Sequence, residues 1–453
     1  MITAFRKVLL LTIIALSTAA RAQSVLDQYI TDGLHNNIVL KQRNISLEKA
    51  MTSLKIANSY FAPAIGVQGN YTSGLGGRSI AIPVGDLLNP VYTTLNQLTA
   101  SDKFPNIQNV DQNFFPYNFY DAKLHTTLPL INTDLIYNRK IAQQQVVMQE
   151  YEVVIYKREL IKNIKVAYYN YLSALEAVRI YESAMARSEE GRRVSESLMQ
   201  NGKGLAAYVL RSQSEIESVR AEKSEAERQV ENARMYFNFL LNRSTHEPIL
   251  IASDDQPLII SDIDSVSVEN REELKLLRES IELNLNVKRM SNLFWLPKIN
   301  GFLDLGSQAQ DWKMSNQTRY YLWGLQLDVP LFNGMRNRNK IKLADLDAQS
   351  ATLGYSSNRQ QINLAAQTAR NTFFTSQLNY TSARKQQEAA QSYERLIEKG
   401  YKEGVNTFIE VIDARNQLTQ SQLQVTLNRY RVLSAAAQLE RETASYSIPQ
   451  TEN

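Results

Sequence analysis

The sequence predicts an internally duplicated α+β protein, and three observations support this fold class. Prolines are absent from two stretches of 118 residues, 130–247 and 331–448, which are rich in the strong helix formers Ala, Glu, Gln, Lys, Arg and Leu. Segments in front of each stretch alternate apolar and polar residues, which is typical of half-buried strands. The flanks also match, with Leu-Pro-Leu-Ile-Asn at 128–132 and Val-Pro-Leu-Phe-Asn at 329–333. Each half is therefore expected to contain a helix, two strands and a long helical hairpin.

The first 22 residues have the features of a secretory signal peptide. Arg6 and Lys7 form a basic start, residues 8–16 form a short apolar core, and residues 20–22 fit a small-x-small cleavage site. The apolar core is too short to span a membrane as a helix. An exported chain of this kind could be periplasmic, secreted, or inserted in an outer membrane as strands.

The composition excludes several kinds of chemistry. The chain of 453 residues has no cysteine and three scattered histidines, so disulfides, thiolate metal sites and cysteine nucleophiles are excluded and a histidine metal site is not expected. No G-x-S-x-G, H-E-x-x-H or phosphate-binding loop is present. We therefore expect no catalytic, cofactor-binding or metal site, and an exported enzyme is the weakest of the function classes considered.

The first repeat is expected to cover residues 23–247. It contains an amphipathic helix, strands at about 62–73 and 118–130, and a long helical hairpin over 131–243. The connection between its strands, about 74–117, is rich in Gly, Pro, Asn, Ser and Thr and is predicted to be a surface loop.

The second repeat is expected to cover residues 269–440, with strands at about 297–307 and 319–330 and a helical hairpin over 332–440. The junctions between strand and helix are marked by three residues that break regular structure: Pro129, Pro330 and Gly334. Residues 248–268 are expected to link the repeats, and 441–453 to form a C-terminal tail.

Four strands in one chain pose a physical problem. Their outward apolar and inward polar residues suit a transmembrane barrel wall, yet four strands cannot close, and open edges are not tolerated in lipid. Either the strands form a soluble sheet, or several chains pool them, and three chains would supply twelve. The long arms must also bury an apolar stripe, which favours antiparallel coiled-coil hairpins. A spectrin-like rod or an ordinary helical bundle remains an alternative for the arms alone.

Each helical arm contains glycines about 70 residues after its start. Gly202 and Gly204 interrupt the first arm, and Gly400 and Gly404 interrupt the second. Glu410 and Asp413 follow the second break three residues apart, so both carboxylates share one helix face. A solvated polar face would give the same pattern.

These residues resemble the TolC family of outer-membrane efflux proteins along the whole mature chain. The most specific pieces are FNGMRNRNKIKLADLDA (332–348) and EGVNTFIEVIDARNQL (403–418). The resemblance implies an α+β membrane protein that is a trimer, with a 12-stranded transmembrane β-barrel (four strands per chain) continuing into a long periplasmic α-helical coiled-coil tunnel. It also implies an equatorial region, here the linker 248–268 and the tail 441–453.

The resemblance further implies a periplasmic gate at the second break. Glu410 and Asp413 match a ring of acids at the constriction, and crowding could raise their pKa values. Tyr401 matches an aromatic residue that helps to hold the tip closed. Asn406 departs from the family, where the best-known members carry an arginine, and Leu210 departs where some carry an aspartate. The hairpin tips are expected to dock an adaptor through six residues: Gly202, Gly204, Leu205, Gly400, Gly404 and Val405.

The function implied is a passive outer-membrane exit duct of a tripartite efflux or type I secretion system in a Gram-negative bacterium. The expected partners are two further copies of the chain, outer-membrane lipid, a periplasmic adaptor (membrane fusion protein), and an inner-membrane RND, ABC or MFS transporter that supplies the energy. No nucleic-acid partner is expected. The alternative is a periplasmic coiled-coil structural or adaptor protein, which would share the hairpins but need no membrane.

Overall fold

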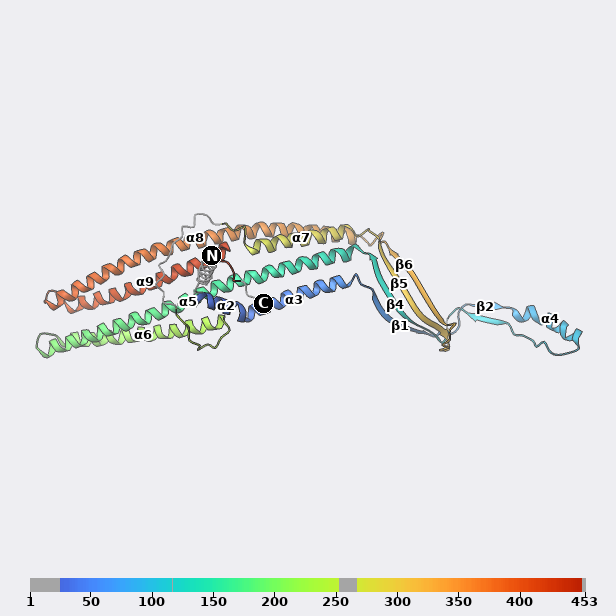
Figure 1. The fold of residues 1–453 in the computed structure, drawn as a ribbon, viewed down its shortest axis with the longest axis horizontal. Coiled ribbons are helices and arrows are strands. Elements are labelled where there is room, and N and C mark those ends of the chain that lie inside the picture. The colour runs from blue at the N-terminus through green and yellow to red at the C-terminus, as the bar shows by residue number, and fades with distance from the viewer. Residues whose placement is uncertain (1–24, 116, 252–266, 450–453) are drawn as a thin grey trace, which may run out of the picture. The chain divides into compact units, whose positions relative to one another are not determined.

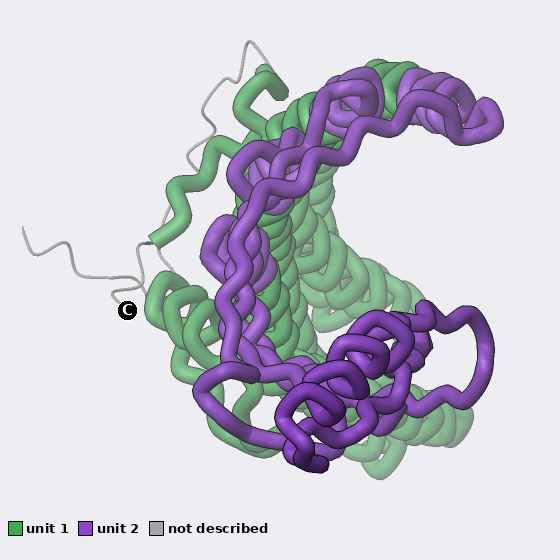
Figure 2. The backbone as a smooth tube through the Cα atoms, turned by 90° about the vertical axis from the view of Figure 1, so that its right-hand side faces the viewer, with its two compact units in different colours: residues 1–51, 144–284, 346–453 green, residues 52–143, 285–345 purple. Residues whose placement is uncertain are grey.

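The computed structural model describes residues 25–115, 117–251 and 267–449, which form two compact units (Figure 2). The first unit is drawn from Met1–Met51, Gln144–Asn284 and Leu346–Asn453, and the second from Thr52–Gln143 and Leu285–Asp345. The expected signal peptide, most of the expected linker 248–268 and the last four residues of the tail lie outside the described residues.

The second unit is built on a four-stranded antiparallel sheet in the order β1-β4-β5-β6 (Figure 1). Its strands are β1 (Ala64–Thr72), β4 (Phe119–Ile131), β5 (Lys298–Gln310) and β6 (Arg319–Asp328). Each of the four expected strand ranges overlaps one of them, and β4 and β5 extend beyond the expected ends to Ile131 and Gln310. Pro129 lies near the end of β4, at a register shift against β5. Pro330 follows β6, and Gly334, with φ +57°, lies before the next helix.

The two faces of this sheet differ in polarity. One face exposes large apolar side chains: Val67, Tyr321, Trp323 and Leu325 are 66–84% exposed. On the other face the Lys123 ammonium pairs with the Asp304 carboxylate at 2.7 Å, and His125 also contacts Asp304. The alternation along the strands therefore divides the sheet into an apolar and a polar face, as a period of two requires.

At the end of the sheet where β1 finishes and β4 begins, the connection between β5 and β6 contacts the residue that precedes β4. Asp311 and Asn118 both have positive φ, and the Asn118 side chain donates to the Asp311 carboxylate at 2.6 Å. The Trp312 ring stacks on Tyr120, with centroids 5.3 Å apart.

The connection between β1 and β4 is more regular than the predicted surface loop. It contains the hairpin β2 (Ser79–Ile82) and β3 (Val110–Asn113), and between them the helix α4 (Val84–Thr99). Gly76 and Gly77 take positive φ before β2, Pro83 precedes α4 and Pro90 lies inside it. Asparagine side chains of α4 bond to the backbone of the insertion.

Besides α4, the helices of the described residues form two antiparallel hairpins and three shorter segments (Figure 1). The first hairpin is α5 (Thr133–Gln200) with α6 (Ala206–Leu240), and the second is α8 (Arg336–Lys402) with α9 (Phe408–Thr443). The shorter helices are α2 (Val25–Asn36), α3 (Ile38–Ser59) and α7 (Glu272–Asn292). At 1.5 Å per residue, α5 and α8 are each about 100 Å long. Within the described residues, none of the helices combines the length and the apolar character needed to cross a bilayer.

The core of the first unit lies where α2 packs against α5 and α6. Ile30, Ile164 and Phe237 are fully buried there, and the Tyr29 ring meets Phe237 edge to face at 5.0 Å. Asn37 lies between the end of α2 and the start of the next helix. Its side chain donates to the Leu240 carbonyl (2.9 Å) and accepts from the Leu40 amide (3.0 Å). A buried polar residue is satisfied in this way while it ends one helix and begins the next.

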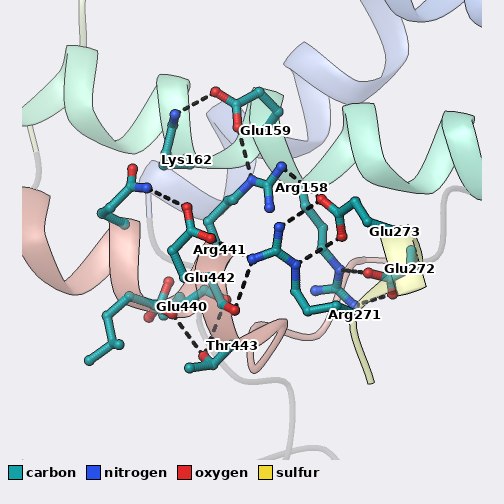
Figure 3. Close-up of polar contacts among 12 residues, drawn as sticks. Arg158, Glu159, Lys162, Arg271, Glu272, Glu273, Glu440, Arg441, Glu442 and Thr443 are labelled. Atoms are coloured by element: carbon teal, nitrogen blue, oxygen red, sulfur yellow. Dashed lines mark hydrogen bonds and ion pairs between the residues drawn. The ribbon is translucent and has the colours of Figure 1, made fainter. Parts of the chain in front are cut away.

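A network of ion pairs ties α5, the start of α7 and the end of α9 together in the first unit (Figure 3). The Arg271 guanidinium, 4% exposed, holds Glu273 with two hydrogen bonds of 2.8 Å and also donates to the Glu442 carbonyl. Arg441 bridges Glu159 and Glu273, each at 2.9 Å.

The same network extends along α5. Arg158 forms a two-pronged pair with Glu272 at 2.7 and 2.8 Å. These planar, charge-assisted contacts fix the geometry of the groups as well as pairing their charges. Arg441 and Glu442, at the start of the expected tail 441–453, are held by these contacts.

Candidate functional site at the hairpin tips

The two hairpin tips share one backbone design. The Lys203 amide donates to the Leu198 carbonyl at 2.8 Å, and the Val405 amide donates to the Gly400 carbonyl at 2.8 Å. These six-to-one bonds, with a left-handed residue just before each donor, form a Schellman motif. The left-handed residues are Gly202 (φ +69°) and Gly404 (φ +77°).

The other two predicted glycines have a different role. Gly400 lies inside α8, and a Cβ there would collide with the Asn406 side chain. Gly204 lies against Leu198, where a Cβ would be 3.0 Å from the Leu198 Cβ. The two glycines that interrupt each arm therefore do not act alike. One glycine in each pair makes the turn, and the other permits close packing.

Glu410 completes the start of α9. The Thr407 side chain accepts from the Glu410 amide at 3.3 Å, and the Glu410 carboxylate accepts from the Thr407 amide at 2.6 Å. This capping box satisfies two of the free amides at a helix N-terminus. The Thr407 backbone amide and hydroxyl, joined by the Asn406 amide group, lower the pKa of Glu410.

This shift belongs to the single chain, where the hydrogen-bond donors around Glu410 favour its ionised form. The rise expected from crowding concerns a ring formed by three copies and stays a prediction. Asp413, one turn further on, is exposed. The two predicted acids therefore differ in their surroundings: Glu410 is tied to the helix start, and the Asp413 side chain is in contact with solvent.

Tyr401 belongs to an aromatic cluster that joins both tips. The Phe408 ring, 3% exposed, lies 5.3 Å from Tyr208 of α6 and 5.9 Å from Tyr401 of α8. Burial, together with the nearby Tyr208, raises the pKa of Tyr401. Tyr401 could be found from its place in the resembled motif. Phe408, a few residues further on, was not singled out, and Tyr208 was missed because it comes from the other arm, far away in the sequence.

Two arginines make a second connection, between α5 and α9. Arg415 donates to the Arg187 carbonyl at 3.0 Å, and the Arg187 side chain donates to the Thr419 hydroxyl at 3.1 Å. Burial lowers the pKa of the Arg187 guanidinium, with Glu394 opposing this shift and Arg415 adding to it. Gly191 of α5 makes room for Arg415, because a Cβ at that position would collide with its guanidinium.

These arginines were not predicted, although the sequence contains a signal for their contact. Gly191 is an isolated glycine inside a strongly helical stretch, and such a residue often marks close packing. Asn406 and Leu210 are the two departures from the resembled family. The helices around them are joined by the aromatic cluster and by the hydrogen bonds of Arg415 and Arg187 to a carbonyl and a hydroxyl.

Apolar side chains are exposed at both tips. Leu205, which precedes α6, is 60% exposed, and Val405 is 80% exposed. Leu210 is 70% exposed and Ile409 is 56% exposed. Apolar groups gathered at an exposed end of a molecule are typical of an interaction surface.

Comparison with known proteins agrees with this architecture. The family model described as outer membrane efflux protein matches residues 30–243 and 289–444, which is most of the chain. No curated protein matches the chain in sequence.

Solved structures match over nearly the full length. The outer-membrane channel OprN has a TM-score of 0.77 at 16% identity, with 94% of this chain and 91% of OprN covered. The CmeC outer membrane channel of Campylobacter jejuni has a TM-score of 0.73 at 14% identity, with 94% and 87% covered. The outer membrane protein VceC of Vibrio cholerae has a TM-score of 0.73 at 15% identity, with 92% and 95% covered. At these identities the likeness shows a shared fold.

Proposed function

The chain belongs to the outer membrane efflux protein family, and we propose that it forms the exit duct of a tripartite efflux or type I secretion system. As a member of this family it is an outer-membrane protein of a Gram-negative bacterium, and it is not an enzyme. The proposed duct conducts substrates passively, and an inner-membrane RND, ABC or MFS transporter supplies the energy.

The observation that carries this proposal is a four-stranded sheet with one apolar face and two edges without a strand partner. Within the described residues, β1 pairs only with β4, and β6 pairs only with β5. Free strand edges cannot face lipid, because their amides and carbonyls would have no partners. Three copies joined edge to edge give a closed barrel of twelve strands, which lies within the range of known outer-membrane barrels. The exposed apolar face then meets lipid, and the face with Lys123 and Asp304 lines the lumen.

Two measurements test the duct. The detergent-solubilised protein should have the mass of a trimer, and it should form conducting pores in planar bilayers. A monomer recovered from the soluble periplasmic fraction would contradict the proposal and support the alternative, a periplasmic coiled-coil structural or adaptor protein.

We place the periplasmic gate at Asp413, Glu410, Tyr401 and Asn406. Three copies would bring the exposed Asp413 side chains together as a ring, and rings of carboxylates favour cations in pores. The double substitution of Glu410→Ala with Asp413→Ala should weaken block by trivalent cations in planar bilayers. Glu388→Ala, an exposed acid of α8 away from the tip, is the matched control. Equal block of the native protein, the double variant and the Glu388→Ala control would show that the acids form only a solvated face.

The adaptor is proposed to dock at the tips. The exposed Leu205 and Val405 side chains, together with the four tip glycines, offer a small apolar surface. A photo-crosslinking residue at Leu205 or Val405 should capture a membrane fusion protein in cells. The same residue at Leu364, equally exposed in the middle of α8 (64%), should not. Capture from position 364 alone would place docking elsewhere.

A further inference from the structure

Helix α4 and the segment that follows it form a small folded element with a defined orientation. The Asn89 side chain makes two bonds to Ile107, donating to its carbonyl at 2.9 Å and accepting from its amide at 2.8 Å. Asn96 does the same with Phe104, at 2.8 and 3.1 Å. Asn89 and Asn96 are seven residues apart, so one side of the helix is held against residues 104–107.

A third asparagine fixes the start of the helix. The Asn109 side chain accepts from the amides of Gly85 and Asp86 at 3.0 and 3.1 Å, and donates to the Asp86 carboxylate at 2.9 Å. This arrangement satisfies amides that the helix itself leaves free. The helix is therefore pinned along its length, and the orientation of its opposite side is set by these bonds.

That opposite side is apolar and exposed. Leu87 is 69% exposed, Val91 is 52% exposed and Leu98 is 78% exposed, and Thr94 between them is also exposed. The spacing of these residues is four, three and four, which is the a/d spacing of a coiled-coil heptad. In that heptad Asn89 and Asn96 occupy the f position, directly across the helix from the a/d seam.

The charges of α4 suit contact with copies of itself. Between Val84 and Thr99 the only charged residue is Asp86, and it is held by Asn109. The positions beside the seam carry Leu88, Pro90, Leu95 and Gln97, so parallel copies would meet without like-charge repulsion.

We propose that the α4 faces of the three copies in the trimer pack against one another through Leu87, Val91, Thr94 and Leu98. This inference rests on the proposed trimer. The insertion joins β1 to β4 at the end of the strands opposite to the helices α3 and α5. With those helices in the periplasm, α4 lies on the outer side of the membrane. The three copies are tethered to one barrel, and their high effective concentration allows a small contact area to suffice. Three packed helices would cover the outer mouth of the duct.

The absence of cysteine in this chain allows a direct test. Val91→Cys places a thiol in the a/d seam. Thr93→Cys places a thiol two residues further on, on the side of the helix that faces away from the seam. Both variants are treated in intact cells with a mild oxidant, and in parallel with a membrane-impermeant maleimide. Val91→Cys should give covalent dimers and little maleimide labelling, whereas Thr93→Cys should give strong labelling and few dimers. The trimer is measured separately, by the mass of the reduced protein.

The possible results separate the two proposals. Trimers in which both positions label equally would show that the α4 face is open, and would overturn this inference alone. Trimers in which Val91→Cys neither labels nor crosslinks would show that another molecule covers the face, and would also overturn it. A monomeric protein would overturn the proposed trimer together with this inference.

Discussion

Substitution of Glu273 should cost more stability than any substitution of a surface acid. Its carboxylate is held by two bonds from Arg271 and by Arg441 (Figure 3). Burial opposes ionisation there, but the hydrogen bonds and charge of Arg271, with the charge of Arg441, lower the pKa of Glu273 from 4.5 to about 2. At about 1.4 kcal/mol per unit, this shift corresponds to roughly 3 kcal/mol of folding free energy. Removal of one partner of a buried ion pair typically costs about 3–5 kcal/mol, so the two magnitudes agree.

The pH dependence of this contribution follows from the sign of the shift. Because folding lowers the pKa, the unfolded chain binds more protons than the folded chain between the two values. The stabilisation is complete above the unfolded value near 4.5, and it is lost as the pH falls toward 2.

Denaturant unfolding of the purified protein, followed by circular dichroism, measures the effect. Glu273→Gln should be destabilised by roughly 3 kcal/mol at pH 7, and the difference from the native protein should shrink as the pH is lowered below 4.5. Glu217→Gln is the control, because Glu217 pairs with Arg220 on an exposed helix face (58% and 59% exposed). Exposed pairs contribute about 0–1 kcal/mol. A Glu273→Gln variant as stable as the control, or a difference that does not change with pH, would refute the reasoning.

Four further substitutions in the helical arms give predictions. Asp413→Asn should reduce the cation preference of the proposed pore in planar bilayers, measured as reversal potential in a salt gradient. Glu410→Ala should chiefly lower thermal stability, by about 0.5–2 kcal/mol, through loss of the capping box. Gly354→Ala, where a Cβ meets no atom within 4 Å, should stabilise α8 by about 1 kcal/mol. Gly191→Ala should gain less stability in thermal melts, because its new Cβ must displace the Arg415 guanidinium.

The long elements could be predicted from the sequence because their signals are local and repeated. The alternation in β6 and the proline-free stretches each extend over many residues, so a few exceptions do not hide them. The insertion with α4 was missed for the opposite reason. Its helix contains Pro90 and is stabilised by asparagine side chains bonded to a distant backbone segment, and such bonds leave no periodic signal.

The candidate site could be predicted only in part. The glycine pairs correctly marked the breaks in the two arms, but composition does not separate the glycine needed for positive φ (Gly404) from the one needed for close packing (Gly400). The acids could be found from their spacing, but the position of Glu410 three residues after Thr407 also predicts a capping box, and the structure shows that bond. The contact of Phe408 with Tyr208 joins residues 200 positions apart and could not be inferred from one sequence.

The aromatic cluster predicts how the proposed gate at the tips should respond to salt. Interactions between charges at the surface weaken as ionic strength rises, because the screening length falls from about 10 Å at 0.1 M to about 3 Å at 1 M. The contacts of Phe408 with Tyr208 and Tyr401 are neutral and lack this dependence. If they hold the tip closed, the conductance of the native pore should rise between 0.1 M and 1 M KCl only as the conductivity of the solution rises.

Phe408→Ala should then raise single-channel conductance at both salt concentrations, since it removes two ring contacts worth about 0.5–1.5 kcal/mol each in addition to the buried area. Phe239→Ala, at an exposed position of α6 (69%), serves as the control and should conduct like the native protein. A native pore that opens steeply with salt, or a Phe408→Ala pore no more conductive than the control, would mean that charged groups hold the tip closed. In that case the bonds of Arg415 and Arg187 between α5 and α9 would be the first contacts to remove.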